Sequence, residues 1–341
     1  MSNSVSKISK ISFVSNLQNS IKQRFVKDFS LPITIFNNDL FYYYCITLND
    51  FLDIENKAKL LYNFIKNNED VLENKEKFFE ISSKFNTDVI EYIKGKESFN
   101  KFLQFDMNKF KVHNYKNSNI YHSDNDSKYY FTVDLIKGNF QAFKYFDPNI
   151  VDNMNDYENF IKQFTKYDYF VQSKYIRQVI FGHLNTKRQQ TIMKYIMMEI
   201  YKKIEKYLDN IFELECLNND ELIFNIKVPV FNNKYKKKII FLLKELKKLP
   251  FNLKVNIFKL KHLKPENMYV KEYINRFLLY TWKDDIIEEY LDNYKKIEFK
   301  CVPNNVFMQV FKYYFNMELD DRDLYFYYDK RLAKWLKPLF E

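Results

Sequence analysis

The stretch that decides the fold reads ECLNNDELIFNIKVP and runs from Glu215 to Pro229. In it, an apolar approach leads to two adjacent carboxylates, Asp220 and Glu221, and a strand-like run follows them. This order predicts a strand, a tight turn and a second strand. Like charges side by side repel unless a positive charge lies between or in front of them. From these residues alone, the pair indicates either a bound divalent metal ion or the solvated tip of a hairpin.

Composition bounds the class of protein. The chain has 341 residues and is 46% hydrophobic, which is enough for a sizeable core or for two domains. Lys and Arg number 54 against 44 Asp and Glu, so the net charge is +10. A basic surface favours a polyanionic partner, nucleic acid first and an anionic membrane second. The alternative is that the excess merely accompanies a composition rich in Lys, Asn and Ile.

Glycine and cysteine usage excludes several classes of site. Only three glycines occur, which excludes glycine-rich phosphate-binding loops. The three cysteines lie far apart and form no CxxC or Cys/His pattern, which argues against a disulfide framework or a structural zinc site. No apolar run approaches 18 residues, so we expect no transmembrane segment. We therefore expect an intracellular, cytoplasmic protein, with a viral replication site as one location of that kind.

The order of predicted elements indicates an α+β fold with an antiparallel sheet backed by helices. The segment YYFTVDLI (residues 129–136) predicts a strand, and NLKVNIFKLKHL (residues 252–263) predicts a return strand after a basic amphipathic helix. Three regions follow from this order. We expect a mostly helical N-terminal region at 1–128, a sheet-containing region at 129–262 and a helical C-terminal region at 263–341.

Asp134 ends the first of these strands, and Asp220 lies at the turn before another. If both strands belong to one sheet, the two carboxylates lie at adjacent strand ends. There they could hold two Mg²⁺ (or Mn²⁺) ions about 4 Å apart, which activate a 3′-hydroxyl and stabilise a leaving pyrophosphate. Lys174 and Arg177, about one helical turn apart, could neutralise an incoming triphosphate. The alternatives are that Asp134 caps the next helix and that the two cations form a solvated helix face.

Three short segments carry a resemblance to a known family. NNDELIFNIKVP resembles motif C of family A DNA polymerases, with Asp220 at the catalytic aspartate and Glu221 at the glutamate after it. RQVIFG is similar to the end of motif B, with Arg177 at the lysine position. VDLIKGNFQAF resembles motif A, with Asp134 as the metal-binding aspartate and a spacing nearer to single-subunit phage-type RNA polymerases. The resemblance covers residues 129–262 and implies a polymerase-like palm domain with fingers-like helices.

The resemblance also implies roles for individual residues. Asp134 and Asp220 would ligate magnesium, with Glu221 in support. Lys174 and Arg177 would hold the triphosphate. Phe181 would stack on the incoming base, and Gln141 would line the sugar pocket. In a locally basic stretch, Lys187 and Arg188 are either ordinary surface charges at a helix start or contacts to template phosphates.

The chain also departs from the family pattern. Asn219 stands where the family has histidine, and Arg177 stands where it has lysine. The gap of 43 residues from Arg177 to Asp220 is short for the family and nearer to reverse transcriptases and viral RNA-dependent polymerases.

The resulting hypothesis is a minimal template-dependent nucleotidyltransferase of DNA replication, in a virus or mobile element, that acts on primer-template and nucleoside triphosphates. An enzyme of this size would rely on a protein partner for processivity. The alternatives are a reverse-transcriptase-like or RNA-polymerase-like enzyme, and an inactive palm-like subunit that binds nucleic acid. A basic, aromatic-rich interaction protein without polymerase ancestry is a further alternative.

Overall fold

The computed structural model describes residues 10–35, 37–112, 115–227, 233–264, 266–274, 297–328 and 331–334. The chain divides into two compact units. The helical unit comprises Met1–Asn100, Met154–Leu184 and Val302–Lys337. The sheet unit comprises Lys101–Asn153, Asn185–Cys301 and Pro338–Glu341. Among the described residues, no helix combines the length and apolar character that a bilayer crossing requires.

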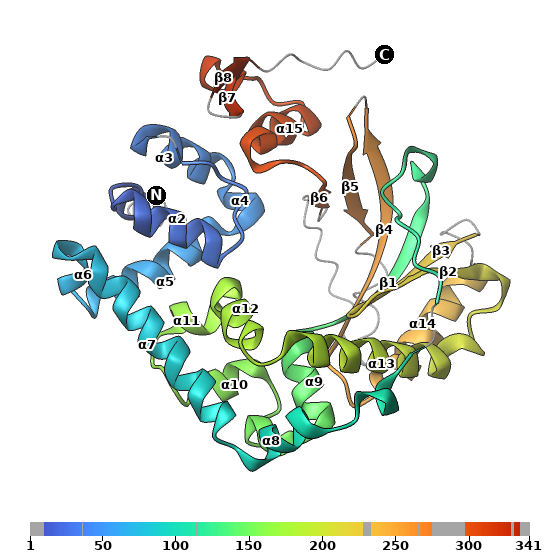
Figure 1. Cartoon of the computed structure of the whole chain (residues 1–341). Helices are drawn as coiled ribbons and strands as arrows, with labels where there is room; N and C mark the ends of the chain where they lie inside the picture. The colour runs from blue at the N-terminus through green and yellow to red at the C-terminus, as the bar shows by residue number, and fades with distance from the viewer. Residues whose placement is uncertain are drawn as a thin grey trace, which may run out of the picture. The chain divides into compact units, whose positions relative to one another are not determined.

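The sheet unit is built on a six-stranded antiparallel sheet with the strand order β2-β3-β1-β4-β5-β6 (Figure 1). Its strands are β1 (Tyr129–Leu135), β2 (Phe212–Leu217), β3 (Glu221–Ile226), β4 (Leu253–Leu263), β5 (Met268–Tyr273) and β6 (Ile297–Lys300). Its main helices are α9 (Gly138–Phe146), α13 (Thr186–Glu205) and α14 (Asn233–Lys247). Helices α9 and α13 lie between β1 and β2 in sequence, and α14 lies between β3 and β4. The first four strands therefore follow the split β-α-β order, and the predicted α+β class with an antiparallel sheet is confirmed.

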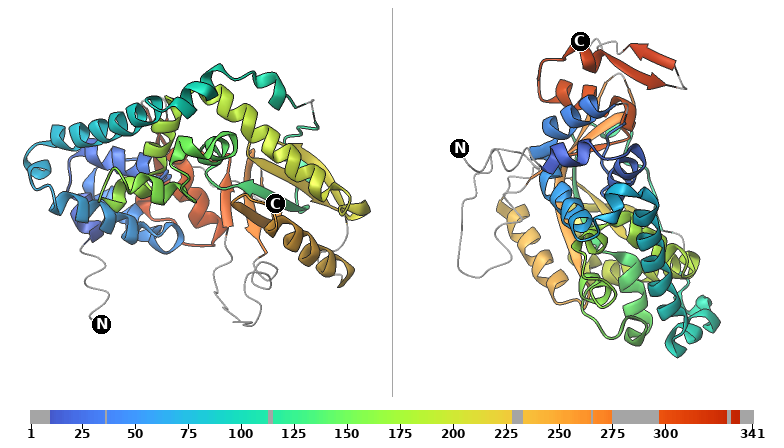
Figure 2. Two further views of the ribbon diagram at one scale, coloured as in Figure 1. Left: turned by 90° about the horizontal axis from the view of Figure 1, so that it is seen from below. Right: turned by 90° about the vertical axis from the view of Figure 1, so that its left-hand side faces the viewer.

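Helices cover one face of this sheet. Phe131 of β1 packs against Phe212 and Phe224, with ring centroids 5.5 and 5.9 Å apart. Tyr201 of α13 stacks on Phe224 at 6.3 Å, which places α13 over this face. Helices α13 and α14 contact each other alongside the strands (Figure 2). Because side chains alternate along a strand, Tyr130, Thr132 and Asp134 of β1 point to the opposite face.

The opposite face has an apolar part and a polar part. Its apolar cluster consists of Ile120, Tyr130, Cys216, Ile223, Phe258, Leu260 and Tyr269. Toward the end of β1 the same face becomes polar. There, buried Thr132 lies opposite buried Asn256. Asp134 is the next residue of β1 on that face. The sheet thus changes from core to a candidate site within one strand.

Close packing fixes the segment that leaves β1. Lys137 has a φ of 53°, and Gly138 then begins α9. A Cβ atom at Gly138 would lie 2.6 Å from Met193 Sδ of α13, so the missing side chain allows α9 and α13 to approach closely. The Asn139 side chain donates to Gln189 Oε1 of α13 at 2.6 Å. These contacts hold the exit of β1, and with it Asp134, against a long helix.

The helical unit consists mainly of helices, including those of the described N-terminal residues up to Asn100. Its helices are α2 (Asn19–Asp28), α3 (Asn38–Thr47), α4 (Asn49–Leu52), α5 (Ile54–Lys66), α6 (Asp70–Glu73), α7 (Lys75–Lys94), α10 (Tyr157–Ile161), α11 (Asp168–Gln172), α12 (Lys174–Gly182) and α15 (Phe307–Tyr314). Helix α8 (Glu97–Gln104) runs across the division between the units. Aromatic rings dominate the core. Phe64 contacts Phe78, Tyr167, Tyr169 and Phe170, with centroids 5.0–5.8 Å apart.

The expectation of a helical C-terminal region is wrong for much of what the structure describes there. Strands β5 and β6 extend the sheet, and β7 (Tyr325–Tyr328) pairs with β8 (Arg331–Lys334). In β5, Tyr269 and Val270 favour a strand, and β5 pairs with β4 as the second arm of a hairpin. Residues 275–296, which were also expected to be helical, lie outside the described residues. The predicted region 129–262 is shared, because its strands belong to the sheet unit while α10, α11 and α12 belong to the helical unit.

Candidate active site

Three acidic residues converge at one end of the β1–β3 pair. Asp134 of β1 and Glu221 of β3 are direct cross-strand partners. The backbone N–H of Leu135 donates to the carbonyl of Asp220 at 2.8 Å, which anchors the β2–β3 turn to the end of β1. The turn itself closes through the Asn218 N–H and the Glu221 carbonyl, 2.9 Å apart. The structure therefore places Asp134, Asp220 and Glu221 together, at the adjacent strand ends expected from the sequence.

Burial and mutual repulsion disfavour the charged forms of these acids. Burial raises the pKa of Asp134, and the nearby charge of Asp220 raises it further, while Lys254 and Lys271 lower it. Burial also raises the pKa of Glu221, with Lys271 acting against it and Asp134 adding to it. The side chain of Glu221 is 20% exposed. Asp134 and Glu221 thus form a partly buried acidic pair. Nearby lysines offset part of the repulsion between the two carboxylates.

Strands on the β4 side supply these lysines. Lys254 of β4 is exposed and is the cross-strand partner of Asp134. Lys271 of β5 is 4% exposed, and its Nζ lies 3.7 Å from Glu221 Oε1. Sequence reasoning missed both lysines. The alternation of β4 placed Lys254 on a strand without giving its partner, and β5 was not recognised as a strand.

A second charged pair flanks this group. Glu298 of β6 is the cross-strand partner of Lys271. Its carboxylate accepts hydrogen bonds from Lys300 Nζ and from the Tyr273 hydroxyl, both at 2.6 Å. Burial acts to raise the pKa of Glu298, but these hydrogen bonds outweigh it and lower that pKa. Glu298 is therefore held ionised by its own partners.

The donor set fits a divalent cation that arrives with additional ligands. Among the described residues, no group of three or more histidine, cysteine, aspartate or glutamate side chains is arranged to hold a metal ion. Mg²⁺ is commonly bound by one or two carboxylates together with phosphate oxygens and water. Asp134 and Asp220 can supply that share of the ligands. The remaining positions of such an ion would need ligands from outside these residues.

Gln141 and Arg188, two of the predicted ligand-binding residues, bind backbone carbonyls within the sheet unit. The Gln141 amide donates to the carbonyls of Ile136 and Asn252 at 2.5 and 2.8 Å, and its oxygen accepts from the Asn252 N–H at 2.9 Å. These bonds join α9, the exit of β1 and the approach to β4. Arg188 Nη1 donates to the carbonyls of Phe102 and Phe105 at 3.0 and 2.7 Å. Both side chains thus have structural partners.

Lys187, the neighbour of Arg188, is exposed in the first turn of α13. Its predicted contact with template phosphates stays a prediction.

The residues predicted to bind the triphosphate and the base belong to the helical unit. Lys174 is exposed at the start of α12, after the N-cap Ser173. Arg177 is half-buried, its guanidinium carbon lies 5.7 Å from the ring centroid of Tyr157, and burial lowers its pKa. Phe181 is 1% exposed and packs against Tyr157 with centroids 6.0 Å apart. Its ring therefore belongs to the core of this unit.

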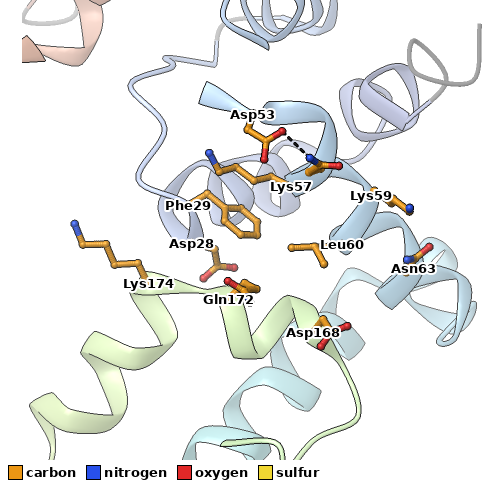
Figure 3. Close-up of a pocket in the computed structure, with 11 residues that line it drawn as sticks. Asp28, Phe29, Asp53, Lys57, Lys59, Leu60, Asn63, Asp168, Gln172 and Lys174 are labelled. Carbon is orange, nitrogen blue, oxygen red and sulfur yellow. Dashed lines mark hydrogen bonds between the residues drawn. The ribbon is translucent and has the colours of Figure 1, made fainter. Parts of the chain in front are cut away.

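Lys174 also lines a pocket of about 740 Å³ within the helical unit (Figure 3). The lining residues are Asp28, Phe29, Asp53, Asn56, Lys57, Lys59, Leu60, Asn63, Asp168, Gln172 and Lys174. Three lysines stand against three aspartates, so the lining favours neither an anion nor a cation. Asp28 is already bound, since it accepts from the hydroxyls of Tyr169 and Ser173 at 2.5 and 2.7 Å. No local sequence pattern indicates this pocket, because its walls come from segments far apart in the chain.

In comparisons with known proteins, no family model matches this chain, and no curated protein or solved structure matches it either.

Proposed function

We propose that this protein is a template-dependent nucleotidyltransferase that adds nucleotides to a 3′-hydroxyl on a palm-like sheet. The observation that carries the proposal is the pairing of β1 with β3, which sets Asp134 against Glu221 and brings Asp220 to the same end. The split β-α-β strand order supports it, because helices cover one sheet face while the polar end of β1 lies on the other.

The acidic residues have distinct roles in this proposal. Asp134 and Asp220 would hold Mg²⁺ or Mn²⁺, and Glu221 would support them from the neighbouring rung. A bound divalent cation would activate the 3′-hydroxyl and offset charge on the leaving pyrophosphate. The raised pKa values of Asp134 and Glu221 mark carboxylates that would gain from a cation, as is common at functional sites.

Cationic residues would meet the nucleic acid and the triphosphate. In the sheet unit, Lys254 lies beside Asp134, and Lys187 is exposed on α13. In the helical unit, Lys174 is exposed and Arg177 is half-buried, and triphosphate binding by these two residues stays a prediction. Phe181 and Gln141 are left out, because packing and backbone hydrogen bonds occupy them. The short spacing from Arg177 to Asp220 keeps a reverse-transcriptase-like or RNA-polymerase-like enzyme within the proposal.

One observation favours a second candidate, an inactive palm-like subunit that binds nucleic acid. Lys271 already pairs with Glu221, so a cation of the protein itself occupies part of the acidic group. In this candidate the basic surface binds nucleic acid through phosphate contacts, and no nucleotide is added.

Primer extension separates the two candidates. Wild type, Asp134→Asn and Asp220→Asn are given DNA and RNA primer-templates with all dNTPs or NTPs and Mg²⁺ or Mn²⁺. Asp209→Asn is the matched control, because this acid of the same unit is paired with Lys238 on the surface. We expect extension by wild type and the control, and a loss of at least about 100-fold in the two site variants.

The other outcomes have definite meanings. Salt-sensitive binding to primer-template without extension by wild type would support the inactive subunit. Extension that survives Asp220→Asn would rule out the proposed site. Absence of both extension and binding would leave the acidic pair as a hairpin tip.

A further inference from the structure

Lys271 is a buried cation that points toward the acidic group. Its side chain is 5% exposed, and its Nζ lies 3.7 Å from Glu221 Oε1. That separation exceeds hydrogen-bonding distance, so the contact is an ion pair without a tight hydrogen bond. Lys271 also interacts electrostatically with Glu298 and, more weakly, with Asp134. A single ammonium group therefore lies near three carboxylates, two of which, Glu221 and Asp134, belong to the acidic group.

The surroundings of Lys271 include a carboxylate with hydrogen-bond donors of its own and two aromatic rings. Glu298, its cross-strand neighbour, already accepts hydrogen bonds from Lys300 and Tyr273 and also attracts Lys271. The ammonium group lies 4.5 Å from the ring centroid of Phe258 and 5.9 Å from that of Tyr121. Aromatic faces attract a cation at such distances. Lys271 thus keeps a favourable position even when it is not paired with a carboxylate.

We propose that Lys271 is a positioning residue that neutralises Glu221 and Asp134 while no divalent cation is bound, and that it competes with that cation for them. The inference rests on the proposed function, because it concerns the same carboxylates. Loss of the lysine would leave the acids closer to full repulsion, which destabilises the protein without cation. The same loss would strengthen cation binding, because a unit positive charge no longer opposes it.

Cation binding without nucleotide tests this competition. Binding of Mn²⁺ is followed by the electron paramagnetic resonance signal of the free ion, for wild type and Lys271→Met. We expect the dissociation constant to fall by about tenfold in the variant, since charges within several ångströms interact at that level in a partly buried site. We also expect a lower melting temperature without cation and a larger rise when Mn²⁺ is added.

Matched variants separate charge competition from a general loss of stability. Lys312→Met removes another buried lysine from its carboxylate, Asp323, in the helical unit. It should lower the melting temperature and leave Mn²⁺ affinity unchanged. Asp134→Asn should weaken Mn²⁺ binding, because it removes one of the two proposed carboxylate ligands. The double variant Glu221→Gln/Lys271→Met removes both charges of the pair, so it should recover stability and bind Mn²⁺ more weakly than Lys271→Met.

Each result decides the inference independently of polymerase activity. Tighter Mn²⁺ binding in Lys271→Met supports it even if primer extension fails, in which case the proposed function alone falls. Unchanged or weaker binding in a folded Lys271→Met protein overturns it, even if wild type extends primers. Absence of Mn²⁺ binding in wild type and in every variant overturns it as well.

Discussion

Each unit of this protein buries a lysine against a carboxylate. The two pairs differ in whether the lysine and the carboxylate are hydrogen-bonded to each other. In the helical unit, Lys312 Nζ lies 2.6 Å from Asp323 Oδ2, and the Tyr43 hydroxyl accepts from Lys312 and donates to Asp323. Burial acts to lower the pKa of Lys312, but these hydrogen bonds raise it above its ordinary value. In the sheet unit, Lys271 lies 3.7 Å from Glu221, and burial lowers the pKa of Lys271.

The hydrogen-bonded pair belongs to the core of the helical unit, whereas the looser pair lies at the candidate site of the sheet unit. Asp323 is fully buried, and its Oδ2 accepts from Lys312, from Tyr43 and from the backbone N–H of Asp320, the last at 2.8 Å, while its buried Oδ1 has no hydrogen-bond partner among the described residues. Glu221 adjoins the β2–β3 turn, where Asp220 is exposed, and burial raises the pKa of Glu221 while Lys271 offsets this only in part. A carboxylate that the fold leaves under-compensated is the kind that can accept an external cation.

Removal of each lysine should give the largest difference in stability between the two pairs. Lys312→Met leaves Asp323 buried without its cation, which should cost about 3–5 kcal/mol of the free energy of unfolding. Lys271→Met should cost less, on the order of 1–2 kcal/mol, because Glu221 is partly exposed and can take up a proton or water. Urea denaturation of both variants beside wild type measures the two costs. Equal losses of unfolding free energy would show that the two pairs contribute equally to stability.

Removal of each carboxylate should give changes of opposite sign. Asp323→Asn leaves Lys312 buried with its charge unpaired, and we expect a loss of about 2–4 kcal/mol. Glu221→Gln relieves repulsion with Asp134 and removes a charge that burial disfavours. We therefore expect no loss at pH 7 and a gain of up to about 1 kcal/mol. Thermal and urea unfolding of these two variants would test this contrast, and a large loss in Glu221→Gln would place the Glu221 pair in the structural class.

The pH dependence of stability should show the smallest difference. Glu221 has its pKa raised above 4.5, so the folded protein binds more protons than the unfolded chain just above that pH. Its contribution is therefore present at and below pH 4.5 and is lost as pH rises through the folded pKa. The groups that face it are Lys271, Lys300, Asp134 and Asp220.

Glu221→Gln should remove this decline. Relative to the variant, wild type should lose on the order of 1 kcal/mol between pH 4.5 and 7. Unfolding free energies at the two pH values for both proteins measure the change. A difference between the proteins that stays constant across this range would show that the pKa of Glu221 is not raised by the fold.

Local patterns in the sequence were sufficient for the strands that carry the acids. The alternation in Tyr129–Leu135 and the polar interruption at Asn218–Asp220 are short-range signals, so both strands and the turn could be predicted. The acids could be placed at adjacent strand ends because two strands that pair antiparallel bring the end of one beside the start of the other. The helical N-terminal region followed in the same way from apolar residues at three- and four-residue spacing.

Only the tertiary structure decided which lysines face these acids and which predicted ligands are occupied elsewhere. Lys271 reaches Glu221 across the sheet because β3 and β4 both pair with β1, and these pairings join segments far apart in the chain. Phe181 and Gln141 stand in segments that resemble motifs, yet packing against Tyr157 and hydrogen bonds to Asn252 occupy them. The sequence by itself therefore determined which residue types enter the sheet and in what order. The register and the long-range packing determined which charges meet, because those depend on the whole folded chain.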